Sequence, residues 1–239
     1  MRFLSKFFRK SSTECSSSCE EDKHSPATKG QSPLIFISGS KMPYVDRKEI
    51  DRFRGICEAI GEMLGREGFG IVGCPPHVER VLASQCAKIG LLRVNPTACF
   101  STAGLPDNRL YAQDRIRFIR RASVAVFIGG SDGTLQEYRQ CKEHGTDPLI
   151  PVSGAGGAGA ELARRLSLDP TDFWSCQVDQ SAISVLCSPD QDPAVYANAI
   201  LSILSAHTIQ PKPPPDDEEP ITDERRHRYT EDCDWESDE

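Results

Sequence analysis

The sequence has no apolar run of the roughly 20 residues that a membrane-spanning helix needs, so a transmembrane helix is excluded. It also lacks a secretory signal, because the apolar stretch within residues 1–10 is short and interrupted by charges. With 38 % hydrophobic and 26 % charged residues, the 239-residue chain still has enough apolar content for a core. We therefore expect a folded, cytoplasmic protein.

The ten cysteines lack the C-x-x-C pairs that are typical of zinc sites, and the five histidines form no ligand pattern with them. Several cysteines, among them Cys57, Cys86 and Cys187, fall within apolar helical or strand patterns, where a thiol packs as a small hydrophobic side chain. We expect reduced thiols in a reducing compartment, no metal site and no bound cofactor.

A basic stripe of the kind that binds nucleic acid is also missing. The chain has a net charge of −7, and residues 210–239 hold 12 acidic and 4 basic side chains, a balance of −8. The other residues therefore sum to +1, so the body of the protein is close to neutral. We expect no nucleic-acid partner.

Composition divides the chain into three parts. Residues 1–32 are a Ser-rich arm that we predict to be disordered, although the amphipathic pattern of residues 1–10 leaves open a contact with an anionic membrane surface. Residues 210–239 combine proline with clustered acid and are predicted to be a second disordered tail. Residues 33–209 are the one predicted domain.

Strand and helix patterns alternate along this domain. The predicted strands are 33–40, 69–74, 91–94, 123–130, 147–154 and 182–187, and the predicted helices are 47–66, 76–89, 109–121, 133–145, 157–166 and 193–206. This alternation predicts an α/β fold, a Rossmann-like parallel sheet with helices on both faces. Ligands of such sheets bind beyond the carboxyl ends of the strands, which points to the loops 38–44, 73–78, 129–134 and 153–159.

The strongest motif is GGSDGTLQE, which begins at Gly129. Its glycines, Gly130 and Gly133 included, allow a sharp turn and a close approach to a ligand. A helix predicted to begin at Thr134 would present free N–H groups that favour phosphate, and Glu137, one turn later, can reach back to a ribose. The alternative that stays open is a capping box in which Thr134 and Glu137 satisfy each other.

Three further segments are weaker candidates. The turn SGSK at 38–41 follows the first strand, where nucleotide folds place a phosphate turn, or it is an ordinary strand-to-helix turn. The glycine-rich segment 153–159 can admit a ligand or a partner backbone within contact distance, or it is a flexible turn. The arginine-rich segment 115–122 is predicted to be mostly a solvated helix face, yet Arg115 can reach the site.

The segment AQDRIRFIRRASVAVFIGGSDGTLQE resembles the core of the SLOG superfamily, which reads as a helix, a strand and then P-G-G-x-G-T-x-x-E. That superfamily contains the Lonely Guy phosphoribohydrolases, formerly termed lysine-decarboxylase-like proteins, and nucleotide-sensing domains of bacterial defence systems. The continuation EYRQCKEHGTDPLIPVSGAGGAGAELARRL is even more similar to the sensor branch, whose strand ends in I-P-V-G-A-T-G. The resemblance spans 33–170 and is most specific over 122–162.

The resemblance implies two glycine-containing loops around a nucleotide-derived ligand. The ligand-binding residues it implies are Gly39, Ser40, Gly129, Gly130, Ser131, Gly133, Thr134 and Glu137. For an enzyme, Glu137 and Arg115 would be catalytic. However, the arginine that the enzymes need falls on Asp114, Ser131 stands at their second glycine and Gly129 at their proline. These departures favour binding over catalysis.

Three functions remain open. The first is binding or sensing of a nucleotide-derived ligand of the ADP-ribose or cyclic ADP-ribose type, with the signal passed on by oligomerisation or to a separate effector protein. The second is hydrolysis of the N-glycosidic bond of a nucleoside 5'-monophosphate, as in the Lonely Guy group. The third is a non-catalytic scaffold that acts through its tails. The resemblance also implies a homo-oligomer.

Overall fold

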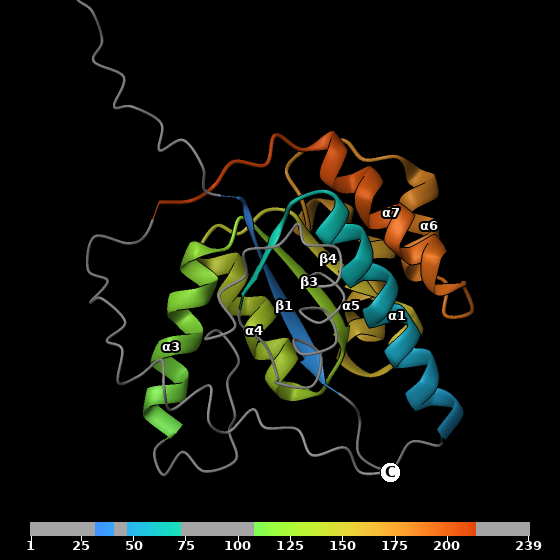
Figure 1. Ribbon diagram of the computed structural model, residues 1–239, viewed down its shortest axis with the longest axis horizontal. Helices are drawn as coiled ribbons and strands as arrows, with labels where there is room; N and C mark the ends of the chain where they lie inside the picture. The colour runs from blue at the N-terminus through green and yellow to red at the C-terminus, as the bar shows by residue number, and fades with distance from the viewer. Residues whose placement is uncertain (1–31, 41–46, 73–107, 214–239) are drawn as a thin grey trace, which may run out of the picture. The chain divides into compact units, whose positions relative to one another are not determined.

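A parallel sheet forms the centre of the domain in the computed structural model, which describes residues 32–40, 47–72 and 108–213. Within these residues the sheet has four strands in the order β2-β1-β3-β4, and each neighbouring pair is parallel (Figure 1). The strands are β1 (Leu34–Ser40), β2 (Gly70–Val72), β3 (Val124–Gly129) and β4 (Leu149–Val152). The predicted α/β class with a parallel sheet is therefore confirmed.

The central strands are apolar on both faces. Every residue of β3 is buried, and Ile35, Phe36 and Ile37 of β1 have no exposed surface. Near-continuous apolar runs are typical of parallel strands whose two faces are both covered. The run in β1 ends at Ser38, whose side chain is polar and yet fully buried. A buried hydroxyl needs a hydrogen-bond partner, and the partner of Ser38 belongs to the candidate site described below.

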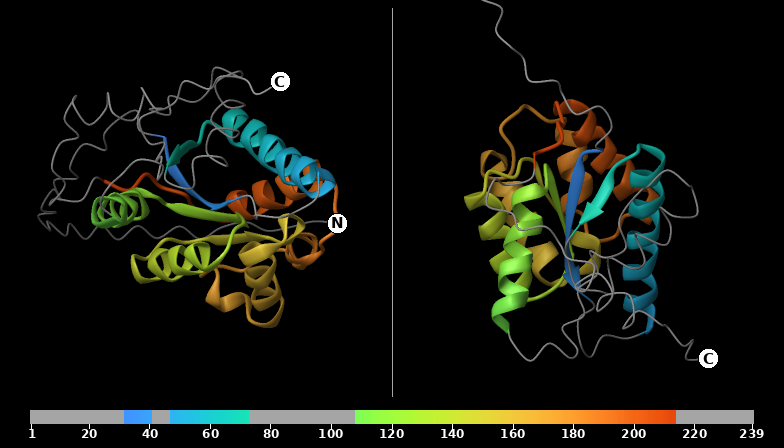
Figure 2. Two further views of the ribbon diagram at one scale, coloured as in Figure 1. Left: turned by 90° about the horizontal axis from the view of Figure 1, so that it is seen from below. Right: turned by 60° about the vertical axis from the view of Figure 1, so that its left-hand side comes forward.

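Helices cover both faces of this sheet. Helices α3 and α4 lie on one face, and α1 and α5 lie on the other, where α7 packs against α1 and α6 packs against α5 and α7 (Figure 2). The bounds are α1 (Arg47–Arg66), α3 (Asn108–Arg121), α4 (Asp132–Glu143), α5 (Gly157–Leu168), α6 (Gln180–Cys187) and α7 (Pro193–Ala206), with the short 3-10 helices η2 (Ser153–Ala155) and η3 (Pro170–Asp172). No helix within the described ranges has both the length and the apolar character needed to cross a bilayer.

One predicted element has the wrong type: residues 182–187, predicted as a last strand, belong to helix α6. The carboxylate of Asp179 caps this helix by accepting a hydrogen bond from the backbone N–H of Ser181 at 2.9 Å. The buried side chains of α6 lie at helical spacing: Ala182, Ile183 and Leu186. A short apolar run does not distinguish a strand from a buried helix by periodicity. The cap at Asp179 provides the missing helix signal.

The other predicted strands and helices that fall on described residues are present, with their ends shifted by a few residues. The predictions of a helix at 76–89 and a strand at 91–94 concern residues outside the described ranges, as do the predictions for residues 1–31 and 214–239.

Residues that follow α7 contact the body of the domain, because the hydroxyl of Ser123 donates a hydrogen bond to the carbonyl oxygen of Gln210 at 2.5 Å.

The direction in which the chain adds strands reverses between β1 and β3. From β1 the chain continues to β2 on one side, whereas from β3 it continues to β4 on the other. The register pairs Ser38 with Phe127 and Ser40 with Gly129, so the carboxyl ends of the two strands coincide. Open α/β sheets bind their ligands at such a topological switch point. The fold thus brings residues 38–40, at the end of β1, and the GGSDGT segment that begins at the last residue of β3 to the same place.

Candidate functional site

The carboxyl ends of β1 and β3 come unusually close, and a glycine makes this possible. Gly39 has φ +148°, and a Cβ atom built on it would lie 1.8 Å from the carbonyl oxygen of Ile128. An L-residue rarely adopts this φ and has no space here, so the sheet itself requires glycine. Of the other predicted residues at this edge, Ser40 is paired with Gly129 in the register, and Gly129 has φ +65°.

The turn after β3 leads into helix α4, which begins at Asp132 and not at the predicted Thr134. Ser131 is the N-cap residue, and its carbonyl oxygen accepts the N–H of Thr134 at 2.9 Å. Thr134 is buried, and a Cβ atom on Gly130, whose φ is +88°, would lie 2.0 Å from the Thr134 hydroxyl oxygen. The threonine side chain therefore occupies the space that the second glycine of the motif leaves free. Ser131 and Gly133 are exposed beside it, at the positive end of the helix dipole.

Glu137 lies one turn into α4 and is only 3 % exposed. Its Oε2 atom accepts a hydrogen bond from the hydroxyl of Ser38 in β1. Its Oε1 atom lies 3.9 Å from Nη1 of Arg115 in α3, whose side chain is 11 % exposed. The carboxylate therefore joins three elements that are far apart in the sequence. The capping box of Thr134 with Glu137 is wrong, because the N-cap position is Ser131 and the Glu137 carboxylate points to Ser38 and Arg115.

The environment of Glu137 makes its charged form costly in the folded protein. Burial raises the pKa of this carboxyl above its ordinary value, although the hydrogen bond from Ser38 and the positive charge of Arg115 act in the opposite direction. Titratable groups in such environments concentrate at functional sites, because a protein seldom keeps them for stability. A carboxylate accepts up to about four hydrogen bonds. Hydroxyl groups of a ligand can therefore join Ser38 on Glu137.

The glycine-rich segment 153–159 packs against the same turn. The N–H of Ala158 donates to the carbonyl oxygen of Gly130 at 3.0 Å, and a Cβ atom on Gly157 would lie 2.3 Å from that oxygen. A Cβ atom on Gly159 would lie 2.8 Å from the backbone nitrogen of Gly129. The sequence predicted that this segment admits a ligand or a partner backbone or forms a flexible turn, and in the structure it closely approaches a backbone of the same chain. That backbone is the chain's own turn after β3.

Arg52 of α1 holds the glycine-rich segment in place. Its Nε donates to the carbonyl oxygen of Gly154 at 2.9 Å, and its Nη2 donates to that of Gln191 at 3.2 Å and to that of Pro189. One side chain thus joins the glycine-rich segment to the loop between α6 and α7. Gly154 precedes the residues that contact Gly130, so Arg52 helps to position the turn after β3. It does so from the face of the sheet that α1 and α5 cover, opposite to α3 and α4.

Replacing Arg52 by alanine should lower the free energy of unfolding by about 2 kcal/mol, because three carbonyl groups lose a charged donor. Urea unfolding followed by circular dichroism measures this loss. Arg54→Ala is the matched control: Arg54 lies on the same helix and is exposed, so its replacement should change stability by less than about 0.5 kcal/mol. Equal effects of the two changes would contradict the positioning role of Arg52.

The structure thus brings together Gly39, Gly130, Thr134, Glu137 and Arg115 at the switch point between β1 and β3. Two contacts were not predicted from the sequence, that of Ser38 with Glu137 and that of Arg52 with the glycine-rich segment. A signal for Ser38 did exist, since a serine inside an apolar parallel strand needs a buried partner. Among the described residues, no group of three His, Cys, Asp or Glu side chains is arranged to hold a metal ion.

Comparisons with known proteins find a distant likeness to a solved structure and no match in sequence. No protein-family model matches the sequence, and no curated protein matches it. Among solved structures, the X-ray structure of TM1055, a structural-genomics target, matches with a TM-score of 0.44 and 20 % identity, over 63 % of this chain and 88 % of that chain. A likeness at this level carries no argument about family or chemistry. The chain has a Rossmann-like α/β fold, and the site stands on the chain's own residues.

Proposed function

We propose that the switch point between β1 and β3 binds a nucleotide-derived ligand of the ADP-ribose or cyclic ADP-ribose type. The observation that carries this proposal is the buried Glu137 carboxylate, which lies between Ser38 and Arg115 directly beyond the glycine turn of β3. Because burial disfavours the charged carboxylate, Glu137 lowers the stability of the folded protein. Such a cost is typical of a residue that binds a ligand. The resemblance to the sensor branch of the SLOG superfamily points to the same ligand class.

The phosphates and the ribose of such a ligand would bind at two neighbouring positions of the site. Phosphate oxygens would bind at the exposed first turn of α4, near Ser131 and Gly133, where backbone N–H groups and the helix dipole favour an anion. Ribose hydroxyls would donate to the Glu137 carboxylate, one turn further along the helix. The tight packing of Gly130 on Thr134 holds these two positions in a constant relation.

Titration of the full-length protein with ADP-ribose, cyclic ADP-ribose, NAD, AMP and ATP tests the proposal. Thermal shift and calorimetry report binding, and chromatography of the same samples reports whether the ligand stays intact. We expect saturable binding of at least one ligand in intact form. Glu137→Gln should weaken that binding about tenfold or more, because hydrogen bonds to a charged acceptor contribute about 1.5–3 kcal/mol.

Two further variants separate binding from folding. Gly133→Val adds bulk at the exposed start of α4, where an added Cβ meets no atom within 4 Å, so the protein should fold while phosphate is obstructed. Glu161→Gln is the control, since Glu161 is a glutamate on the surface of α5 that binds only Arg164 and Arg165 in the described contacts. If Gly133→Val and Glu137→Gln both bind like the parent protein, the assigned site is wrong.

Hydrolysis of an N-glycosidic bond is the second candidate function, and the approach of Arg115 to Glu137 favours it. In this reaction the bond between ribose and base breaks, water adds to the ribose carbon, and the base leaves with a proton. The Glu137 carboxylate would stabilise the positive charge that develops on the ribose, and Arg115 would bind the phosphate. Arg115 would thus replace the arginine of the Lonely Guy enzymes that falls on Asp114 here.

Release of free adenine from AMP distinguishes the two candidates. Hydrolysis requires that adenine accumulates with time, that Glu137→Gln abolishes its release, and that Glu161→Gln does not. If every nucleotide stays intact while one of them binds, the site is a binding site and the hydrolysis candidate is wrong.

A further inference from the structure

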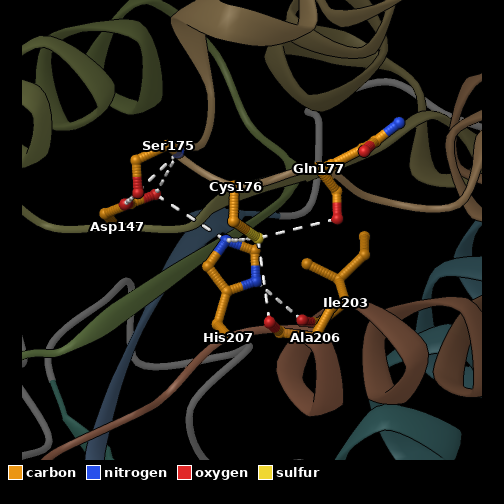
Figure 3. A network of polar contacts seen from close by, with 7 residues as sticks. All are labelled: Asp147, Ser175, Cys176, Gln177, Ile203, Ala206 and His207. Atoms are coloured by element: carbon orange, nitrogen blue, oxygen red, sulfur yellow. Dashed lines mark hydrogen bonds and ion pairs between the residues drawn. The ribbon is translucent and has the colours of Figure 1, made fainter.

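A second group of reactive side chains lies at the opposite edge of the sheet from the candidate site. Asp147 comes just before the amino end of β4, His207 follows the last residue of α7, and Cys176 lies between η3 and α6. Figure 3 shows the three side chains together, with the sulfur of Cys176 directed at the imidazole ring. The Cys176 Sγ atom lies 3.2 Å from Nε2 of His207. A thiol and an imidazole at this distance form a nucleophile and a base in contact.

The tautomer of His207 suits the role of a base. Its Nδ1 atom lies 2.7 Å from the carbonyl oxygen of Ile203, and a carbonyl can only accept, so Nδ1 carries the proton. In the neutral ring Nε2 is then without a proton and faces the sulfur. The side chain of His207 is only 6 % exposed, so its surroundings hold the ring in this orientation.

Asp147 completes the arrangement. Its Oδ1 atom lies 4.0 Å from Nε2 of His207, and the backbone N–H of Ser175 donates to its two oxygens at 3.2 and 3.3 Å. The Ser175 hydroxyl donates to the same carboxylate. When the imidazole takes up the thiol proton, one N–H faces the Ile203 carbonyl and the other faces the sulfur and a fixed carboxylate. The protonated ring is therefore stabilised on both sides.

The other described cysteines have no such base. Cys57 and Cys141 are buried, and burial raises the pKa of each thiol. Cys187 is partly buried, as Cys176 is, but its sulfur donates to the carbonyl oxygen of Ala163 at 3.0 Å, and burial raises its pKa as well. The sulfur of Cys176 also lies 3.8 Å from the carbonyl oxygens of Gln177 and Ala206, but among the described cysteines it alone faces an imidazole nitrogen as well. Cys187 is therefore the natural internal control for Cys176.

We propose that Cys176 is a thiol–disulfide exchange site that forms a mixed disulfide with disulfides of low molecular weight. The Cys176 sulfur attacks one sulfur of the small disulfide R–S–S–R, its proton passes to Nε2 of His207, and a new S–S bond forms. The S–S bond of the reagent breaks, and the departing R–S⁻ takes the proton from His207 and leaves as R–SH. Cys176 is oxidised, one half of the reagent is reduced, and no other oxidant is needed.

Timed reaction of the full-length protein with dithiodipyridine, followed by peptide mass spectrometry, tests the proposal. The reagent is an uncharged disulfide, so local charge has little influence on its approach, and the peptides resolve each cysteine separately. We expect Cys176 to form its adduct at least about tenfold faster than Cys187. Oxidised glutathione, used in a second arm, should place its adduct on the same residue in preference to Cys187.

His207→Asn separates the chemistry of the imidazole from its structural role. The asparagine amide can still donate to the Ile203 carbonyl, but it places no base beside the sulfur. We expect Cys176 to react about tenfold more slowly in this variant, while the rate at Cys187 and the melting temperature stay the same. The proposal is overturned if Cys176 reacts no faster than Cys187 or if His207→Asn leaves its rate unchanged. Should the variant fail to fold, the comparison of Cys176 with Cys187 in the parent protein decides alone.

Discussion

Replacing Gly39 by alanine is expected to destabilise the protein by about 3 kcal/mol or more and to prevent β1 and β3 from pairing at their carboxyl ends. The added Cβ atom would lie 1.8 Å from the Ile128 carbonyl oxygen, inside the atomic radii, and the φ of +148° would have to change. Both strands are buried in the centre of the sheet, so neither can move aside without disturbing the core. Urea unfolding followed by circular dichroism measures the loss.

Gly133→Ala is the matched control for this prediction. Gly133 lies in the first turn of α4, and a Cβ atom there meets no atom within 4 Å. Alanine favours a helix over glycine by up to about 1 kcal/mol, so this variant should be as stable as the parent protein or slightly more stable. A Gly39→Ala protein with the stability of the Gly133→Ala protein would show that the close pairing of β1 with β3 is wrong.

Glu137→Gln is expected to stabilise the folded protein without ligand at neutral pH, although it removes the residue proposed to bind ribose. Burial raises the pKa of Glu137 more than Ser38 and Arg115 lower it, so the charged form costs free energy in the folded state. Glutamine is neutral, has a similar shape, and can accept the hydrogen bond from Ser38. Gain of stability with loss of binding is typical of a functional residue.

The pH dependence follows from the direction of the pKa shift. Because the folded pKa of Glu137 lies above the unfolded one, its favourable contribution is fully present below the unfolded pKa and is lost as pH rises through the folded pKa. The variant should therefore match the parent protein near pH 4, exceed it increasingly as pH rises to the folded pKa, and exceed it by a constant amount above that pKa. Each unit of difference between the two pKa values corresponds to about 1.4 kcal/mol, which unfolding curves at several pH values resolve.

Glu161→Gln should show the opposite sign. Hydrogen bonds from Arg164 and Arg165 lower the pKa of Glu161 to about 2. Its contribution to stability is present above the unfolded pKa and is lost as pH falls through the folded pKa, so the glutamine variant should be slightly less stable at neutral pH. If Glu137→Gln instead destabilised the protein at neutral pH, the ion pair with Arg115 would outweigh the burial of the carboxylate.

The sequence by itself determined the class of fold and led to a prediction of where a ligand would bind. Alternating apolar strands and amphipathic helices are local patterns, and in this order they permit little besides a parallel α/β sheet. The GGSDGTLQE motif, which follows the most apolar strand, predicted a glycine turn and the start of a helix. Both are local signals as well. The fold-class prediction succeeds because it depends on residues that are neighbours in the chain.

Only the tertiary structure decided which side chains meet. Ser38 and Glu137 are 99 positions apart in the sequence, and strand pairing brings them together with Arg115. Cys176 and His207 are likewise 31 positions apart and meet at the opposite edge of the sheet. Contacts of this kind arise from packing over long chain separations, and local pattern carries no information about them.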